Sequence, residues 1–193
     1  MAFPISVIIP AAGSSARMGK PKALLTHNSG VSFARHLLDT YKKHGCGPVI
    51  LVIRPDLDQK SLMQGPHHLV DNHQPELGRS HSIFLGLEHV PAGAACFIHN
   101  VDNPFFSPEL LENLENNLRE DGYAVPVHQG RGGHPILLGG KVVNSLKSAE
   151  RLTDFREILK AFKRVETTWP DDRILWNINT PVDYSKYLLA TIH

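Results

Sequence analysis

The chain has 193 residues, of which 41% are hydrophobic and 20% are charged, and its formal net charge is +1. This size and composition favour one globular domain over residues 1–193 and exclude a disordered or fibrous chain. The small net charge gives no general attraction to nucleic acid or membrane, and no apolar run approaches the length of a membrane span. With no C-x-x-C pair and no basic leader, we expect a cytoplasmic protein.

The strongest local signal is a short apolar strand followed by a small, basic loop. Residues 5–10 are rich in isoleucine and valine, as in a buried central strand, and the next twelve residues read AAGSSARMGKPK. Small residues let backbone N–H groups approach a phosphate closely, and Arg17, Lys20 and Lys22 add three cations. The loop therefore indicates a polyphosphate site. The alternative is an ordinary strand-to-helix turn with solvated lysines.

Two common phosphate motifs do not fit this loop. Five residues separate Gly13 from Gly19, and Pro21 follows Lys20, so the loop is not a Walker A motif. The dinucleotide fingerprint G-x-G-x-x-G is also absent, because Ser15 stands where its second glycine is needed.

The rest of the chain alternates between strand and helix patterns. Further strands are expected at residues 48–53, 69–70, 94–99, 123–127, 136–138, 165–168 and 174–178. Helices are expected at residues 31–41, 80–89, 107–118, 140–147, 153–162 and from 180 onward, with a weaker candidate at 54–65. Ser107 and Thr180, each followed by proline, are N-terminal helix signals. This alternation predicts a three-layer α/β/α sandwich around a Rossmann-like, mostly parallel sheet.

Asp102 follows the strand expected at residues 94–99 and stands two residues before a proline. In a parallel sheet the loop at 11–22 and Asp102 leave their strands at the same edge, so they can meet although they are far apart in sequence. An aspartate there can hold Mg²⁺ against a triphosphate, because this hard cation prefers oxygen ligands. The alternative is an aspartate in a plain turn.

The loop at residues 11–22 resembles the signature A-A-G-x-S-x-R-M-G-x-x-K of the MobA-like nucleotidyltransferases. The matching positions are Ala11, Ala12, Gly13, Ser15, Arg17, Met18, Gly19 and Lys22. The resemblance extends from residue 5 to residue 184 and is greatest to the molybdenum cofactor cytidylyltransferases. It implies a fold of the nucleotide-diphospho-sugar transferase type. Arg17 and Lys22 are its implied catalytic cations, and Asp102, in a D-x-P element, is its implied catalytic metal ligand.

Three further segments resemble motifs of that family. Residues 78–83 resemble the G-x-x-x-S-[IL] segment over the nucleotide base, although Ser80 or Ser82 could instead cap a helix. Residues 131–135 resemble a turn on the acceptor side, and a glycine hairpin with a surface histidine is the alternative. Residues 177–183 resemble the element [DN]-I-[DN]-T-P-x-D, in which Asn177 or Asn179 joins the metal site or only shapes a turn.

These resemblances imply three groups of site residues. The nucleotide-binding group is Ala11, Ala12, Gly13, Ser14, Ser15, Gly78 and Ser82. The metal-binding group is Asp102, Asn177 and Asn179. The acceptor-binding group is Gly133, His134 and Pro135.

The resemblance implies a Mg²⁺-dependent transfer of an NMP from an NTP to a terminal phosphate of the acceptor, with release of pyrophosphate. We expect CTP rather than GTP, because Ala12 replaces a glycine of the guanylyl members and leaves less room for a purine, although Asn179 favours GTP. The implied acceptor is molybdopterin, with a molybdoenzyme or its maturation factor as a further partner. The alternatives are a sugar- or alditol-phosphate nucleotidyltransferase and a non-catalytic protein that delivers a bound cofactor. Residues 148–160 lack the G-D-x-G-A-R loop of cytidylyl members, so the acceptor is less specified than the reaction.

Overall fold

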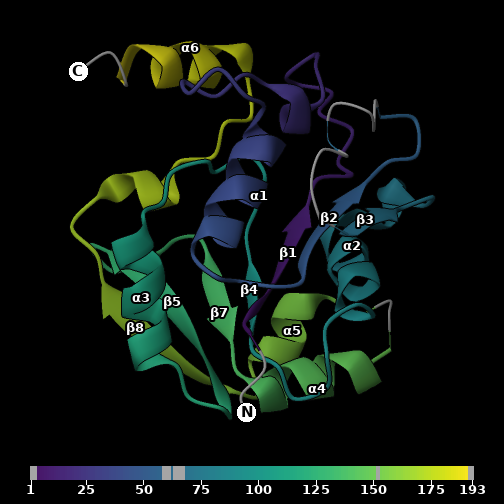
Figure 1. Cartoon of the computed structure of the whole chain (residues 1–193), viewed down its shortest axis with the longest axis vertical. Helices are drawn as coiled ribbons and strands as arrows, with labels where there is room; N and C mark the ends of the chain where they lie inside the picture. Colours follow the sequence, from purple (N-terminus) through teal and green to yellow (C-terminus); the bar gives the residue numbers. More distant parts are fainter. Residues whose placement is uncertain (1–3, 58–61, 63–67, 151–152, 191–193) are drawn as a thin grey trace.

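The computed structural model describes residues 4–57, 62, 68–150 and 153–190, so the weak helix candidate at 54–65 lies largely outside it. Within these residues, eight strands form one sheet in the order β3-β2-β1-β4-β7-β5-β6, with β8 paired to β5 (Figure 1). The strands are β1 (Ser6–Pro10), β2 (Val49–Ile53), β3 (His68–Asp71), β4 (Cys96–Ile98), β5 (Gly122–His128), β6 (Arg131–Gly132), β7 (Ile136–Leu138) and β8 (Lys163–Thr168).

The prediction of a mostly parallel sheet is confirmed, with one reversal. Strands β1 to β4 pair in parallel, as does β8 beside β5. Strand β7 is antiparallel to both β4 and β5. The reversal follows from the short connection after β5, where β6 folds back as a hairpin, because so few residues can join only antiparallel strands.

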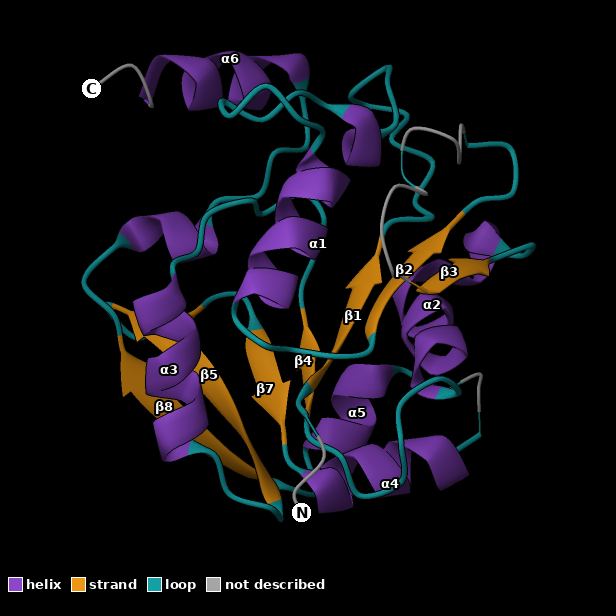
Figure 2. Cartoon of the chain, in the orientation of Figure 1, coloured by secondary structure: helices purple, strands orange, loops and turns teal. Residues whose placement is uncertain are grey.

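Helices cover both faces of the sheet and give the predicted three layers (Figure 2). The first face packs against α1 (Phe33–Lys43) and α3 (Pro108–Asn117), and the second against α2 (Gly78–Leu87), α4 (Gly140–Ser148) and α5 (Phe155–Leu159). Strand residues alternate between the two cores: Val7 and Ile9 of β1 enter the first, and Ile8 enters the second. On the second face, a Cβ at Gly86 would lie 2.7 Å from Ile8, so glycine lets α2 approach β1 closely.

Both N-terminal helix signals are confirmed. Ser107 Oγ accepts a hydrogen bond from the N–H of Leu110 at 3.3 Å at the start of α3. The last helix, α6 (Pro181–Ala190), begins with reciprocal bonds between Thr180 and Asp183. The N–H of Thr180 donates to Asp183 Oδ2 at 2.9 Å, and the N–H of Asp183 donates to Thr180 Oγ1 at 3.2 Å. This capping box fixes the segment that leads into α6.

The strand predicted at residues 174–178 is wrong. Asp172–Leu175 form the 3₁₀ helix η3, which Asp171 caps by accepting a hydrogen bond from a backbone N–H at 2.9 Å. The C=O of Ile174 accepts a hydrogen bond from Asn103 Nδ2 at 2.9 Å. This carbonyl is therefore bonded to the side chain of a loop distant in sequence, whereas in a strand it would bond to a neighbouring strand. Ile174 and Ile178 are both buried, which explains the apolar pattern.

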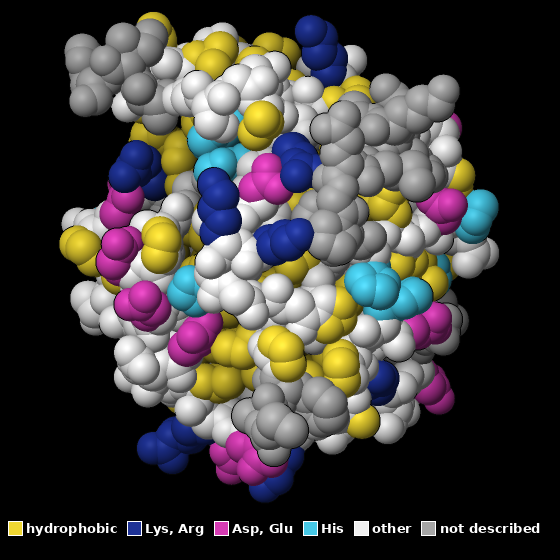
Figure 3. Space-filling view, in the orientation of Figure 1, with side chains coloured by type: hydrophobic (Ala, Val, Ile, Leu, Met, Phe, Trp, Pro, Cys, Tyr) yellow, Lys and Arg dark blue, Asp and Glu magenta, His cyan; other side chains and the backbone are white. Residues whose placement is uncertain are grey.

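The face shown in Figure 3 carries basic, acidic and apolar side chains close together, in keeping with the small net charge. Basic side chains gather over α1, where Arg35 pairs with Asp39 at 2.7 Å.

In the described part of the chain, no helix is both long and apolar enough to span a bilayer.

Candidate active site

The loop after β1 and the turn after β4 meet at the carboxyl ends of these strands. Because β1 and β4 pair in parallel, both chains leave the sheet at one edge. The C=O of Asp102 accepts a hydrogen bond from the N–H of Ile178 at 2.8 Å, which brings residues 177–183 to the same edge. All three segments line a cavity of about 640 Å³. The structure thus brings together three motifs that the sequence separates.

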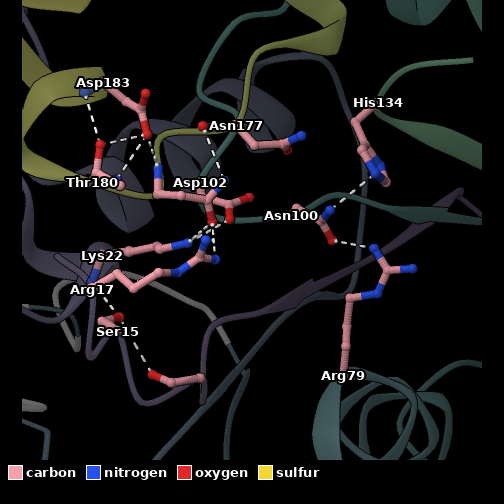
Figure 4. A network of polar contacts seen from close by, with 12 residues as sticks. Ser15, Arg17, Lys22, Arg79, Asn100, Asp102, His134, Asn177, Thr180 and Asp183 are labelled. Atoms are coloured by element: carbon pink, nitrogen blue, oxygen red, sulfur yellow. Dashed lines mark hydrogen bonds and ion pairs between the residues drawn. The ribbon is translucent and has the colours of Figure 1, made fainter. Parts of the chain in front are cut away.

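Lys22 joins these segments inside the cavity (Figure 4). Its ammonium donates to Asp102 Oδ2 at 2.8 Å and to Asn179 Oδ1 at 2.7 Å. Arg17 Nη2 donates to the same Asn179 oxygen at 3.4 Å. The side chains of Lys22 and Asp102 are 16% and 19% exposed, so bulk water reaches their ion pair only in part. Two cations face one carboxylate here, and the excess positive charge suits a polyphosphate.

The structure places Asn179, rather than Asn177, across from Asp102. The Asn179 Oδ1 shares an ammonium with Asp102, whereas Asn177 is exposed and its amide donates to the C=O of Leu175 at 3.4 Å. The Asn179 amide donates to the C=O of Asn177 at 3.1 Å, and the N–H of Asn179 donates to Asp183 Oδ2 at 3.1 Å. The capped start of α6 therefore orients Asn179 toward Asp102.

The loop after β1 presents its backbone to the cavity. Its predicted nucleotide-binding residues all line the cavity: Ala11, Ala12, Gly13, Ser14 and Ser15. Gly13 is exposed, and a Cβ there would have no neighbour within 4 Å, so a ligand can approach this backbone closely. Ser15 has a positive φ of 53°, and its Oγ accepts a hydrogen bond from the N–H of Lys22 at 3.2 Å. This bond closes the loop onto the lysine.

Gly78 and Ser82, the other predicted nucleotide-binding residues, also line the cavity. Gly78 has a φ of 84°, a value that favours glycine, at the start of α2. Ser82 is buried, and its Oγ accepts a hydrogen bond from Asn72 Nδ2 at 3.0 Å. Ser80 donates to Asp154 at 3.3 Å. Neither serine caps α2, which begins without a side-chain cap, so the capping alternative is wrong.

His134 lines the cavity and belongs to a chain of polar contacts (Figure 4). Asn100 Oδ1 accepts a hydrogen bond from Arg79 Nη1 at 3.2 Å, and Asn100 Nδ2 lies 2.9 Å from His134 Nε2. Because arginine can only donate, the amide of Asn100 turns its NH₂ group to the ring, whose Nε2 accepts as in a neutral imidazole. Burial, followed by the charge of Arg79, lowers the pKa of His134 to about 4. The histidine is therefore neutral near pH 7.

The other two predicted acceptor-binding residues, Gly133 and Pro135, are buried and are not among the described residues that line the cavity. A Cβ at Gly133 would lie 2.5 Å from the C=O of Ile174, so packing requires glycine there. Of the alternative, a glycine hairpin with a surface histidine, a hairpin is present between β5 and β6, but the surface histidine is wrong, because His134 is partly buried.

Three polar residues that the sequence analysis did not select also line the cavity: Arg79, Asn100 and Arg156. Arg79 occupies a variable position of the G-x-x-x-S pattern, and Arg156 lies in the segment where the resemblance is weakest. Asn100 did offer a signal, since it is a polar residue just after β4 and two positions before Asp102.

Several known proteins resemble this chain over nearly its whole length. The chain is 27% identical over 186 residues to the molybdenum cofactor cytidylyltransferase of Escherichia coli (strain K12), with 93% of both chains covered. It is 29% identical over 191 residues to the "Probable molybdenum cofactor guanylyltransferase" of Rhodopirellula baltica, with 93% of this chain and 90% of the relative covered. Rv0371c of Mycobacterium tuberculosis H37Rv superposes with a TM-score of 0.82 at 20% identity, over 98% of this chain and 100% of that one. The same protein has also been solved in complex with manganese.

A family model described as the MobA-like NTP transferase domain matches residues 7–167. The matched span begins in β1 and contains the phosphate-type loop, Asp102 and the turn at His134. The family expected from the sequence is therefore confirmed, and so is the class of enzyme. The chain belongs to the MobA-like NTP transferase domain family and is a nucleotidyltransferase.

Proposed function

We propose that this enzyme transfers a nucleoside monophosphate from an NTP to a terminal phosphate of molybdopterin and releases pyrophosphate. The observation that carries the proposal is that the Lys22 ammonium donates to both Asp102 and Asn179. This contact lies in a cavity that is also lined by the small-residue loop after β1. Positive charge and oxygen atoms that could bind a metal ion lie there together, as the transfer of a phosphate-bearing group requires. Two relatives named for the molybdenum cofactor, at 27% and 29% identity, support the acceptor.

The donor set fits a divalent cation such as Mg²⁺. Asp102 Oδ1 is buried and has no hydrogen-bond partner among the described residues, and Asn179 Oδ1, which accepts from the same lysine as Asp102, would be a second oxygen ligand. Mg²⁺ commonly takes one or two carboxylates together with water and substrate phosphates, so it does not need three acidic or histidine ligands, and the described residues offer no such group. The manganese complex of Rv0371c supports a divalent ion. When bound, the ion would supply charge neutralisation and Lewis-acid activation of the phosphates.

The chain's own residues position the reactants and oppose the negative charge. Backbone N–H groups of Ala12 through Ser15 would hold the triphosphate, as small-residue loops do. An oxygen of the acceptor phosphate attacks the α-phosphorus, and the bond from that phosphorus to pyrophosphate breaks. Arg17 and Lys22 would stabilise the charge that grows on the phosphates during this exchange. No covalent bond to the protein is needed, because positioning and charge supply the catalysis.

CTP is the proposed nucleotide. The support is Ala12, which stands where guanylyl members carry glycine, lines the cavity and is only 2% exposed. GTP is the alternative, favoured by Asn179 and by the guanylyl-named relative at 29% identity. Ala12→Gly should therefore raise the rate with GTP relative to the rate with CTP.

Pyrophosphate release with CTP, GTP, ATP and UTP in turn, with Mg²⁺ and with or without molybdopterin, tests this function. We expect release that requires both CTP and the acceptor, and a cytosine dinucleotide product. Faster release with GTP would reverse the nucleotide assignment, and release with a sugar or alditol phosphate would replace the acceptor. Binding of an NTP without any release would identify a delivery protein.

A further inference from the structure

A second pair of cations lines the cavity, apart from Arg17 and Lys22. Arg79 comes from the first turn of α2, and Arg156 comes from the first turn of α5. In Figure 4, Arg79 reaches up from α2 toward Asn100, on the opposite side of Asp102 from Lys22 and Arg17. The cavity therefore has positive charge at two places, with the Asp102 carboxylate between them in this view.

No ion pair neutralises the second pair within the described part of the chain. Arg79 donates one hydrogen bond to Asn100 at 3.2 Å, and Arg156 uses only its backbone N–H, which donates to Asp154 at 2.8 Å. Burial, followed by the charge of Arg156, lowers the pKa of Arg79, while Asp102 and Asp154 act in the opposite sense. Both guanidinium groups thus line one cavity without an ion-pair partner among the described residues, and a bound anion would be attracted to both.

The chemistry of the reaction names the anion. The acceptor phosphate is a monoester with a charge near −2 at neutral pH, and it must approach an NTP that is itself anionic. Arg17 and Lys22 belong to the loop that faces the triphosphate. Arg79 and Arg156 are the other Lys or Arg side chains among the described residues that line the cavity. Arginine also suits this task, since its planar fork binds two phosphate oxygens at once.

We propose that Arg79 and Arg156 bind the phosphate monoester of the acceptor and hold its oxygen for attack on the α-phosphorus. This assignment rests on the proposed function and adds the residues that recognise the second substrate. Asn100 and the neutral His134 then act as positioning residues, because their contacts fix the direction of the Arg79 side chain.

Binding of phenyl phosphate, a simple monoester, tests the pair, and phenol is its counterpart without the phosphate. The protein is first saturated with the α,β-methylene analogue of CTP and Mg²⁺, and each probe is then titrated by calorimetry or NMR. The variants are R79Q, R156Q and the control K20Q, in which the lost cation is exposed and lies outside the described cavity lining. We expect K20Q to match the wild type, phenol not to bind, and each arginine variant to lose about tenfold or more in phenyl phosphate affinity.

Unchanged phenyl phosphate affinity in both arginine variants, or no binding to the wild type, would overturn the assignment. So would a loss of nucleotide affinity in R156Q, which would move the pair to the nucleotide side. The described residues give the Arg156 side chain no hydrogen bond, so R156Q should melt like the wild type. If the wild type bound no nucleotide, the proposed function would fail, and titration of phenyl phosphate without nucleotide would still test the two arginines.

Discussion

Lys22 is the residue through which the loop, the Asp102 turn and the start of α6 contact one another. Lys22→Ala should lower turnover roughly ten- to thousand-fold, because a contact to developing charge is commonly worth a few kcal/mol. Lys20→Ala should change turnover little, since that side chain is exposed on the same loop. Steady-state pyrophosphate release compares the two variants. Equal losses would mean that the loop supplies only a diffuse positive field.

The meeting of Lys22 and Asp102 could be predicted because both follow buried strands, and parallel strands end at a common edge. The choice between Asn177 and Asn179 could not be predicted in this way. It depends on the hydrogen bond that the N–H of Asn179 donates to Asp183 Oδ2 and on the path of the turn that follows η3. The two asparagines have similar neighbours in the sequence, so only the folded structure of the turn shows which one lies next to Asp102.

At the scale of elements, the first turn of α6 orients the site as well as starting a helix. Asp183 Oδ2 accepts from the N–H groups of Asn179 and Thr180 at 3.1 and 2.9 Å. Asp183→Ala should lower the free energy of unfolding by about 1 kcal/mol, as the loss of a capping side chain does, and should also lower turnover. Urea denaturation and pyrophosphate release measure the two effects. Asp183→Asn keeps an acceptor oxygen and is the control, and full activity in the alanine variant would separate the cap from the site.

Elements with a regular spacing of apolar residues or a clear N-terminal signal could be predicted from the sequence. Examples are α3, which follows the cap Ser107, and β2 with its run of β-branched residues. The 3₁₀ helix η3 could not be predicted, because Ile174 and Ile178 are buried by segments distant in sequence and so imitate a strand. Helix α5 is likewise shorter than the pattern at residues 153–162 predicts. In both cases tertiary packing, rather than local propensity, decides the backbone.

In the molecule as a whole, buried histidines make the free energy of unfolding depend on pH. Burial, as the main cause, lowers the pKa of His36 and His134 to about 4 and that of His99 to about 3, from the ordinary value of 6.5. Between pH 6.5 and 4 the unfolded chain therefore binds more protons than the folded chain. The stability that these neutral rings contribute at neutral pH is lost as the pH falls through this window. The aspartates with a lowered pKa, such as Asp154 and Asp171, titrate below it.

Urea denaturation at about pH 7.5 and about pH 5 should show the free energy of unfolding fall by roughly 2–5 kcal/mol. His36→Gln should make the fall smaller, because this variant has no imidazole to protonate at that position. His73→Gln, at an exposed position, should behave as the wild type does. A free energy of unfolding that stays level across the window would show that these rings do not resist protonation in the folded chain.

We propose that the cavity around Lys22 and Asp102 catalyses nucleotidyl transfer, and the variant Asp102→Asn tests this proposal. Asp102→Asn keeps the shape of the side chain but removes the negative charge that would hold the divalent ion. Pyrophosphate release with CTP, Mg²⁺ and molybdopterin is compared between this variant and the wild type, with thermal melts alongside. We predict a loss of about a hundredfold or more in turnover with a similar melting temperature. Near-normal turnover in the variant would show that the Asp102 carboxylate is not needed for the transfer.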